Sequence, residues 1–506
     1  MSTTEEPQKL YVSREPVFPK RVSGTFRNLK WIIMIVTLGI YYVTPWIRWD
    51  RGPNLPDQAV LLDLANRRFF FFWIEIWPHE FYFVAGLLIM AGLGLFLFTS
   101  ALGRVWCGYT CPQTVWTDLF FTVERWIEGD RNARLRLWRA DWDFKKVRLR
   151  VTKYLAWFVI ALATGGAWVF YFADAPTLLV DLVTGQAALV AYVTVGILTA
   201  TTFVFGGFMR EQICIYACPW PRIQAAMMDE DTITVAYREW RGEPRGKGKR
   251  RREKAENAIA TSYAAGSRAD GLEPGDTSAS RTGTDELGDC IDCMACVNVC
   301  PVGIDIRDGQ QLECITCALC IDACDEIMDK IGKPRGLIDY MALTDEANER
   351  AGNPKKPVWK HVFRLRTIIY TALWSAVGVG LVVALFVRSD IDMTVAPVRN
   401  PQFVTLSDGS IRNTYDVRIR NMTHQPTDFE ITLASDQPFE VELEGQEGNI
   451  VNVPADSTHL QRVYVIAPPG SEPAVNNLTN FRFWVEDLST TTRTHQDTTF
   501  FGRDLE

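Results

Sequence analysis

Eight cysteines in the middle of the chain form two runs with the same spacing. The first run, CIDCMACVNVCP, begins at Cys290, and the second, CITCALCIDAC, begins at Cys314. Both follow the pattern C-x2-C-x2-C-x3-C, in which three close thiolates bind three corners of a [4Fe–4S] cubane and the other run supplies the fourth. We therefore predict two clusters. Their predicted ligands are Cys290, Cys293, Cys296 and Cys324 for one cluster, and Cys314, Cys317, Cys320 and Cys300 for the other.

The residues after each run agree with this prediction apart from one departure. Pro301 follows the first run as the pattern expects, whereas Asp325 stands in the place of the second proline. That change leaves all eight thiols in position. Zinc is the alternative, but zinc motifs use four ligands and do not normally employ eight cysteines in this doubled spacing. Two neighbouring clusters would conduct electrons rather than form a catalytic centre.

The other four cysteines form two further pairs, each followed by proline. RVWCGYTCPQ contains Cys107 and Cys111, and QICIYACPW contains Cys214 and Cys218. Residues four apart share one face of a helix, so each pair could bind one ion. Thiolates select Cu(I), zinc or iron–sulfur groups. Plain buried thiols are one alternative, and a zinc site shared by all four cysteines is another.

The histidines argue against a transmembrane haem. The chain has five of them: His79, His361, His424, His459 and His495. None lies in the middle of an apolar segment, so a bis-histidine haem site cannot be built.

Five apolar segments are candidate membrane spans that would position the cysteine pairs. They cover residues 31–47, 82–102, 154–173, 187–208 and 367–387. Most approach the ~20 residues needed to cross a hydrocarbon core. The first thirty residues are polar and end in basic residues, so the first segment reads as an uncleaved anchor. The 17 Trp and 28 Phe are typical of interfacial aromatic belts.

The charges of the loops predict an orientation. Lys and Arg are frequent before the first segment, between the second and third, and in 209–366, whereas 174–186 carries only Asp174 and Asp181 as charges. Basic loops stay in the cytoplasm. The chain should therefore start inside a bacterial cytoplasmic (inner) membrane, cross it five times and end in the periplasm. Both cysteine pairs then lie at cytoplasmic ends of spans, where disulfides are disfavoured.

Two further segments receive predictions. Residues 67–83, RRFFFFWIEIWPHEFYF, are expected to form an aromatic interfacial helix with Glu75 as a partly solvated carboxylate. Residues 390–506 contain short alternating runs between turn residues, which is the signature of a β-sandwich. That domain would dock assembly partners or a copper carrier, or only stabilise the protein. Its histidines, His424, His459 and His495, are expected to be exposed or packed rather than copper ligands.

The predicted fold class is a multi-domain membrane protein with an α-helical bundle, a ferredoxin-like module and an all-β immunoglobulin-like domain. The predicted parts are a cytoplasmic segment 1–30, helices with the C-x3-C-P pairs 31–240, a polar linker 241–288, the cluster module 289–335, a connector 336–366, the last span 367–387 and the β domain 390–506.

The combination of GRVWCGYTCPQTVW, CIYACPWPRIQ and the doubled cysteine run closely resembles the FixG/CcoG family of membrane polyferredoxins. The resemblance covers nearly the whole chain, including the C-terminal domain, for which it implies an immunoglobulin-like fold. It implies reduction of Cu(II) to Cu(I), with Cys107, Cys111, Cys214 and Cys218 as catalytic copper ligands. It also implies copper chaperones and assembly factors of cbb(3)-type cytochrome oxidase as partners.

Two other functions stay open on the residues alone. One is a quinol-linked electron-transfer subunit of the NapH type, in which the thiol pairs are structural. The other is a non-catalytic assembly scaffold that holds copper. We expect no nucleic-acid partner and allow a homo-oligomer, and the sequence does not identify the electron donor.

Overall fold

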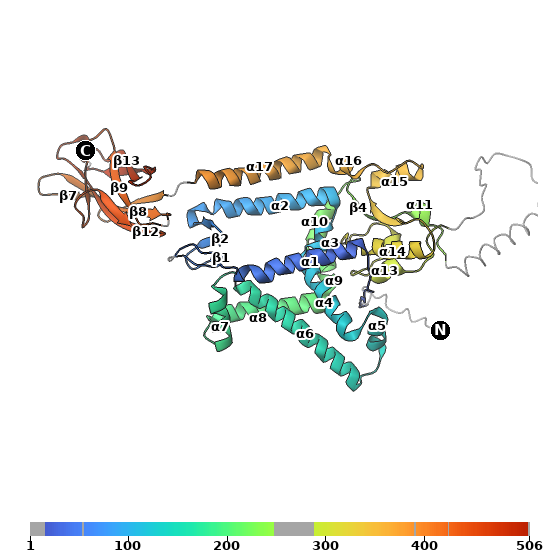
Figure 1. Ribbon diagram of the computed structural model, residues 1–506. Helices are drawn as coiled ribbons and strands as arrows, with labels where there is room; N and C mark the ends of the chain where they lie inside the picture. The colour runs from blue at the N-terminus through green and yellow to red at the C-terminus, as the bar shows by residue number, and fades with distance from the viewer. Residues whose placement is uncertain (1–15, 53–54, 247–287, 389–390, 424, 504–506) are drawn as a thin grey trace, which may run out of the picture. The chain divides into compact units, whose positions relative to one another are not determined.

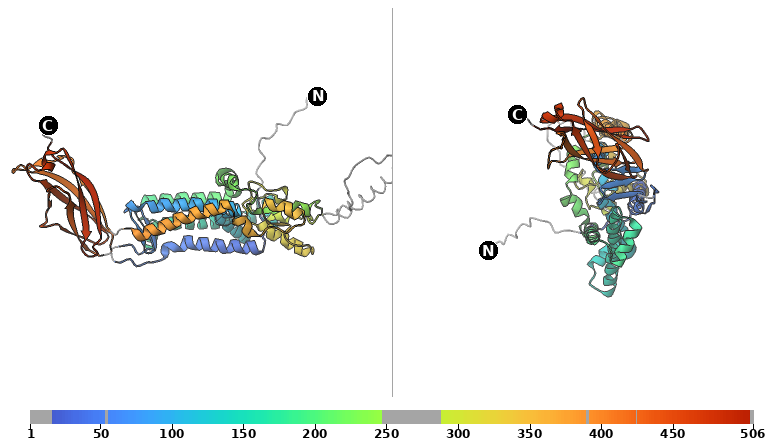
Figure 2. Two further views of the ribbon diagram at one scale, coloured as in Figure 1. Left: turned by 90° about the horizontal axis from the view of Figure 1, so that it is seen from above. Right: turned by 90° about the vertical axis from the view of Figure 1, so that its left-hand side faces the viewer.

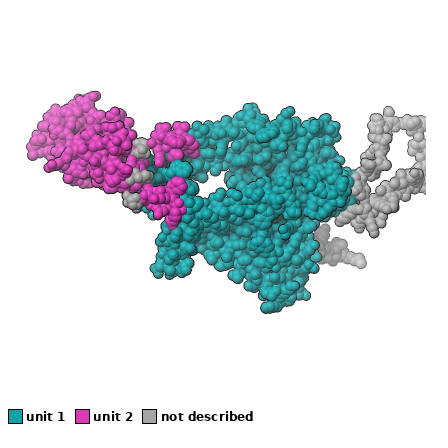
Figure 3. All heavy atoms as spheres, in the orientation of Figure 1, with its two compact units in different colours: residues 1–47, 59–379 teal, residues 48–58, 380–506 magenta. Residues whose placement is uncertain are grey.

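The computed structural model describes residues 16–52, 55–246, 288–388, 391–423 and 425–503 (Figure 1). Most of the predicted linker 241–288, the first half of the predicted segment 1–30, and His424 lie outside these residues. The chain divides into two compact units, which Figure 3 distinguishes by colour: residues 1–47 with 59–379, and residues 48–58 with 380–506.

Among the residues that the structure describes, four helical stretches are long and apolar enough to cross a membrane. They are Thr25–Trp46, Pro78–Leu102, Leu189–Ala217 and Leu365–Val387. They contain α1 (Thr25–Val43), α2 (Tyr82–Leu102), α8 (Leu189–Val204) and α17 (Leu365–Val387). At most 17% of each apolar window is buried inside the protein, so these side chains are free to face lipid. Helices α1 and α2 and the part of α17 up to Val379, all in the first unit, run alongside one another (Figures 1 and 2).

The predicted span 154–173 is not among these four. It falls in α6 (Phe144–Val169), which packs along α8 and continues only as far as Val169. The first turns of α6 carry Lys145, Lys146, Arg148, Arg150 and Lys153. Because the first half of α6 is basic, its apolar stretch is shorter than the apolar stretches of the four candidate spans.

The predicted interfacial helix at 67–83 is wrong. These residues form strands β2 (Arg68–Phe71) and β3 (Ile74–Ile76) and the short helix η2 (Pro78–Glu80). Strand β2 lies between β3 and β1 (Val60–Asp63), and its Phe70 is buried opposite Leu61. The cross-strand partners come from residues that local periodicity does not reveal. Glu75 is also buried rather than partly solvated, because Arg68 supplies a counter-charge at 3.2 Å.

The end of α8 is irregular where the second cysteine pair occurs. The helix continues through the π-helical η3 (Phe205–Met209), α9 (Arg210–Gln212) and the π-helical η4 (Ile213–Ala217). Arg210 has a φ of +33°, which is rare for a residue with a side chain. π-Helical turns inside helices often accompany functional sites.

Shorter helices follow α2, α6 and α8 along the chain. They are α3 (Val105–Tyr109), α4 (Pro112–Glu128), α5 (Arg131–Arg139), α7 (Ala175–Thr184) and α10 (Trp220–Met227). The cysteine-rich module follows, with α13 (Ala295–Val299), η5 (Ile306–Asp308) and α14 (Leu319–Lys330). Strand β4 (Thr234–Tyr237) precedes the module in the sequence and strand β5 (Ile338–Met341) follows it, and the two strands pair antiparallel. The remaining helices of this region are α11 (Glu239–Gly242), α15 (Leu343–Arg350) and α16 (Val358–Val362).

The C-terminal unit contains two antiparallel sheets, in agreement with the predicted β-sandwich. One sheet has the order β10-β12-β8-β6 with β7 paired to β8, and the other has the order β11-β9-β13-β14. The strands are β6 (Ile391–Pro397), β7 (Val404–Thr405), β8 (Ile411–Asn421), β9 (Thr427–Ala434), β10 (Glu440–Leu443), β11 (Ile450–Val453), β12 (Ser457–Ala467), β13 (Leu478–Asp487) and β14 (Arg493–Phe501), with a short helix α18 (Glu472–Val475). Alternate side chains of both sheets form one apolar core around Tyr415, Phe429 and Phe483.

Candidate electron-transfer and metal site

The two cysteine runs adopt the same local backbone. Asp292 and Met294 in the first run, and Thr316 and Ala318 in the second, all have φ between +51° and +60°. These are equivalent positions, two and four residues after the first cysteine of each run. Left-handed residues that are not glycine carry strain, and such turns direct successive N–H groups into one concavity that suits an anion or an iron–sulfur group. The repeated strain therefore fits a cluster in each loop.

The thiols sort into two groups in space. The Cys324 thiol interacts electrostatically with Cys296, Cys293 and Cys290. The Cys320 thiol interacts most strongly with Cys317, Cys314 and Cys300, and less strongly with Cys296 of the other group. A small cavity in the module is lined by Cys296, Cys300, Cys314, Cys317 and Cys320. In each group, three cysteines of one run thus meet the last cysteine of the other.

Backbone donors reach the thiol sulfur of Cys300. Burial raises the pKa of the Cys300 thiol to about 12, and hydrogen bonds from the backbone N–H groups of Val302, Ile304 and Gly303 oppose this rise. A thiolate bound to iron gains from the same donors, because they stabilise its negative charge. The donor set therefore suits a cluster ligand.

The membrane-proximal pairs do not lie on continuous helices. Cys107 belongs to α3, whereas Cys111 has φ −57° and ψ 127° and precedes α4. Cys218 likewise leaves η4 in an extended conformation, with ψ 126°. Proline follows both cysteines and disfavours the helical conformation of the preceding residue. The expectation that each pair shares one helical face is therefore wrong.

The fold nevertheless brings the two pairs together. The Cys107 thiol interacts electrostatically with Cys111 and Cys218, and the Cys214 thiol interacts with Cys111, Cys107 and Cys218. Burial raises the pKa of Cys107 to about 11, although the charge of Arg104 opposes the rise. Among the described residues, no group of three or more His, Cys, Asp or Glu side chains is close enough to hold a single metal ion. A cubane does not need such a group, because each thiolate binds a different iron.

Gln224 fixes the Cys107 side chain. The Cys107 sulfur lies 3.0 Å from Gln224 Oε1, and Gln224 Nε2 donates to Thr99 Oγ1 at 3.2 Å. Gln224 is fully buried on α10. Sequence analysis did not single out this residue, although it lies six positions after Cys218.

The Cys107 loop packs directly on the second cluster run. Gly108 has no room for a side chain, since a Cβ there would lie 2.6 Å from the Ile315 carbonyl oxygen and 3.0 Å from Cys317 Cα. Cys107 itself packs against the apolar cluster that contains Ile315 and Cys317. The Arg104 guanidinium donates to the Leu312 carbonyl. In the sequence, only Gly108 between Cys107 and Tyr109 signalled that the two backbones approach closely here.

A buried ionic network ties the two cysteine-bearing segments together. On α4, Glu124 contacts Arg134 and Arg210, and Lys153 lies 3.7 Å away. Glu128 lies 3.1 Å from Lys153. Arg210 also donates to the Gly207 carbonyl at 2.6 Å. Since α4 begins after Cys111 and Arg210 precedes Cys214 by one turn, the network holds the two thiol pairs in register.

Three family models match the chain. A "4Fe-4S dicluster domain" matches residues 209–343, a "4Fe-4S binding domain" matches 83–132, and the "IG-like fold at C-terminal of FixG" matches 381–503.

Curated relatives match almost end to end. The chain is 67% identical to Protein RdxB of Cereibacter sphaeroides, over 99% of both chains. It is 52% identical to the nitrogen fixation protein FixG of Rhizobium meliloti, over 91% of this chain and 88% of that one. A crystal structure of a FixG-related protein from Vibrio parahaemolyticus matches 23% of this chain and 99% of that chain, at 18% identity and a TM-score of 0.20.

Proposed function

Because this chain belongs to the FixG family and carries iron–sulfur domains on apolar membrane helices, we propose that it is a membrane oxidoreductase that reduces Cu(II) to Cu(I). The single observation that carries the proposal is the packing of Cys107 and Gly108 on the Ile315–Cys317 backbone. A substrate ion held by Cys107 would lie one loop away from the second cysteine run.

The four membrane-proximal thiols favour the reduced ion. Cu(II) prefers nitrogen and oxygen ligands in a tetragonal array, whereas thiolates prefer Cu(I). We assign Cys107, Cys111, Cys214 and Cys218 as copper ligands that act two at a time, because no three of these thiols lie close enough together to hold one ion. Sulfur ligation thereby shifts the copper couple toward Cu(I), and one electron completes each reduction.

The cysteine runs supply that electron through their cofactors. We assign Cys290, Cys293, Cys296 and Cys324 to one [4Fe–4S] cluster, and Cys314, Cys317, Cys320 and Cys300 to the other. When bound, such clusters accept and release single electrons without atom transfer. The product Cu(I) would then serve assembly of a cbb(3)-type oxidase through copper chaperones.

The distribution of Lys and Arg supports an orientation in the inner membrane. The basic segments 125–150 and 209–366 favour the cytoplasm for the cysteine-rich module. Both segments lie on that side only with α6 crossing the membrane beside α8, as the predicted span 154–173 requires. With the module inside, the copper site would face the reducing side of the membrane, and the β domain would lie in the periplasm.

The test uses anaerobically purified full-length protein and a chelator that absorbs light only with Cu(I). Replacement of all four membrane-proximal cysteines by serine should abolish Cu(II) reduction and leave about eight irons per chain, four for each cubane. The matched control is Tyr216→Phe, since Tyr216 is exposed between Cys214 and Cys218. Undiminished reduction in the serine variant would reject the proposal, and stable copper binding without reduction would favour the scaffold.

A further inference from the structure

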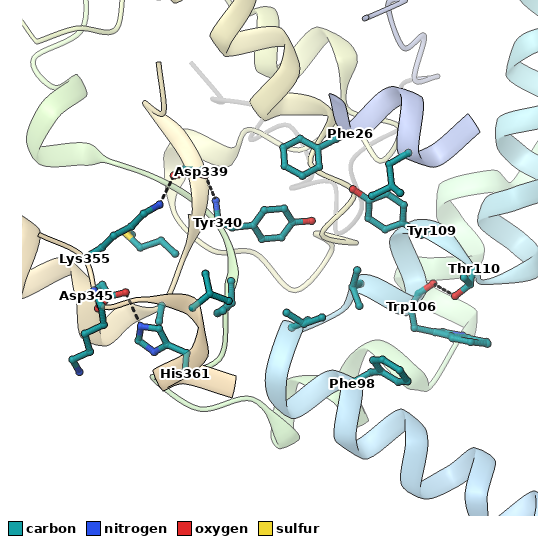
Figure 4. Close-up of a pocket in the computed structure, with 18 of the residues that line it drawn as sticks. Phe26, Phe98, Trp106, Tyr109, Thr110, Asp339, Tyr340, Asp345, Lys355 and His361 are labelled. Carbon is teal, nitrogen blue, oxygen red and sulfur yellow. Dashed lines mark hydrogen bonds and ion pairs between the residues drawn. The ribbon is translucent and has the colours of Figure 1, made fainter. Parts of the chain in front are cut away.

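An apolar cavity of about 630 Å³ lies between the membrane helices and the module. Its walls come from α1, α2, α3, β5 and α16, all within the first unit (Figure 4). Cavities of this size and polarity typically bind small molecules. The thiol pairs do not line it, so the proposed copper chemistry leaves the cavity unexplained.

The mouth of the cavity lies beside the ends of two candidate membrane helices. Leu29 on α1 and Phe98 on α2 line it and are 43% and 53% exposed. Both residues belong to stretches that are long and apolar enough to cross a membrane. Trp106 of α3, 48% exposed, completes this side. A lipophilic molecule can therefore enter from the bilayer without passing through water.

The opposite wall carries a buried histidine between two carboxylates. His361 Nε2 lies 2.8 Å from Asp345 Oδ2, and His361 Nδ1 lies 3.4 Å from Asp231 Oδ1. His361 is 3% exposed, whereas the Asp231 side chain is 42% exposed. Other charged groups around the pair are Lys355, Lys356, Asp339 and Arg364, and Arg364 also pairs with Asp229. A proton taken up by the imidazole thus has a short route to water through Asp231.

The back of the cavity touches the second cysteine run through two tyrosines. Tyr109 donates a hydrogen bond to the Cys317 carbonyl at 3.2 Å, and Tyr340 donates one to the Thr316 carbonyl at 3.1 Å. Both tyrosines line the cavity, and their hydroxyl groups point toward one another (Figure 4). One aromatic layer therefore separates the cavity from a cluster-binding loop.

We propose that this cavity binds a membrane quinol, which is the electron donor of the protein. Quinol oxidation requires an apolar site for the ring, a proton acceptor and a neighbouring one-electron carrier. The cavity offers its apolar walls, His361 and the adjacent second cysteine run for these three roles. Oxidation of the hydroquinone breaks its two O–H bonds and yields the quinone, two protons and two electrons. His361 takes the first proton and passes it to Asp231, from which it reaches water; the imidazole, again free of the proton, then takes the second by the same route.

The number of electrons that a quinol releases matches the number that the proposed clusters and copper ions can accept. One quinol releases two electrons, which two [4Fe–4S] clusters can store singly. Two Cu(II) ions then consume them, so that one quinol and two Cu(II) give one quinone, two protons and two Cu(I). This inference extends the proposed function, but the cavity and its occupant do not depend on copper being the acceptor.

Binding is tested with an azido-substituted short-chain benzoquinone and the full-length protein in detergent. Photolabelling should modify segments that line the cavity, such as 26–33 or 355–361, and an excess of decylubiquinone should prevent it. Leu29→Trp should fill the mouth and reduce labelling at least ten-fold. Ile32→Trp is the matched control, because Ile32 lies on the same helix, is 60% exposed and does not line the cavity.

Electron transfer is tested in the reverse direction. Dithionite-reduced, desalted protein is mixed anaerobically with decylubiquinone, and reoxidation is followed by visible absorbance. Leu29→Trp and His361→Gln should slow this reaction at least ten-fold, with an altered pH profile in His361→Gln. Reoxidation by Cu(II) should be unchanged in both variants, which distinguishes a failure of the quinol site from a failure of the copper site.

The proposal is overturned if labelling falls elsewhere in the chain or is equal in Leu29→Trp and Ile32→Trp. It is also overturned if native mass spectrometry finds a phospholipid that decylubiquinone does not displace. If His361→Gln and the unmodified protein react with the quinone at equal rates, His361 is not the proton acceptor.

Discussion

The phenol of Tyr109 donates a 3.2 Å hydrogen bond to the backbone carbonyl of Cys317. Tyr109 lies two residues after a membrane-proximal cysteine, and Cys317 is central to the second cluster run. The loop that we assign to copper and the loop that we assign to iron and sulfur are therefore in direct contact. Gly108 and Tyr109, which follow Cys107, make this contact and determine how close the two loops come.

Gly108→Val should disrupt this contact. Its Cβ would meet the Ile315 carbonyl oxygen at 2.6 Å, so one of the two backbones must move. Since overpacking typically costs about 1–3 kcal/mol, we expect a lower melting temperature and fewer irons per chain, measured by thermal denaturation and metal analysis. The control is Gly92→Val on α2, where an added Cβ meets nothing within 4 Å. Equal iron content in both variants would contradict the assigned contact.

Gln224→Leu should weaken copper binding without affecting the clusters. The substitution removes the oxygen that lies 3.0 Å from the Cys107 sulfur and leaves Thr99 without its amide partner. Copper binds the deprotonated sulfur, to which the Gln224 amide donates through Nε2 once it turns over, with Oε1 then accepting from Thr99. Loss of such a bond, worth about 1 kcal/mol, should make the Cu(I) affinity several-fold weaker in competition with a chelator. Ile223→Ala, at a neighbouring position that is 41% exposed, should keep the original affinity. An unchanged affinity in Gln224→Leu would show that Gln224 does not orient Cys107 for copper binding.

Much of the architecture could be predicted from local patterns. Four of the apolar segments, the doubled cysteine run and the alternating strands of the C-terminal domain are each encoded by residues close together in sequence. The exceptions depend on distant partners. The 67–83 segment forms strands because Leu61 pairs with Phe70 and Arg68 neutralises Glu75.

The candidate site was harder to predict than the motifs. Spacing alone suggested that each pair shares a helical face, but the prolines after Cys111 and Cys218 keep both cysteines out of the helical conformation. The contact between Gly108 and Cys317 joins residues 209 positions apart. His361 and Asp345 likewise have no motif of their own, and only the fold places them beside Tyr340 in one cavity.

Asp322→Ala should loosen the junction between the module and the first membrane helix. The Asp322 carboxylate, on α14, accepts hydrogen bonds from the backbone N–H groups of Phe26 at 3.3 Å and Arg27 at 2.7 Å. These are unpaired donors in the first turn of α1, and loss of a capping side chain costs about 0.5–2 kcal/mol. We expect a lower melting temperature, measured in detergent. Asp329→Ala, which removes an exposed carboxylate from the same helix, should melt like the unmodified protein. Equal losses in the two variants would argue against the cap.

Glu124→Gln should destabilise the protein strongly at neutral pH. Burial by itself raises the pKa of Glu124, but Arg210, Arg134 and Lys153 together outweigh it and lower the pKa below its ordinary value. The charged form is therefore the one that stabilises the fold. Removal of one partner from a buried ionic network typically costs about 3–5 kcal/mol, because the remaining charges stay uncompensated. Glu230→Gln, at an exposed carboxylate, is the control and should change little.

The pH dependence provides a second test of the Glu124 network. Since the folded-state pKa lies below the unfolded value, the stabilisation is complete above about 4.3, the ordinary pKa of Glu, and is lost as the pH falls through the folded-state pKa. In Glu124→Gln this part of the acid dependence should disappear, so that the melting temperatures of the two proteins converge at low pH. Parallel curves down to the acid limit would show that Glu124 is not charged in the folded protein. The ionic network would then not hold Arg210 and the adjoining Cys214 segment against α4.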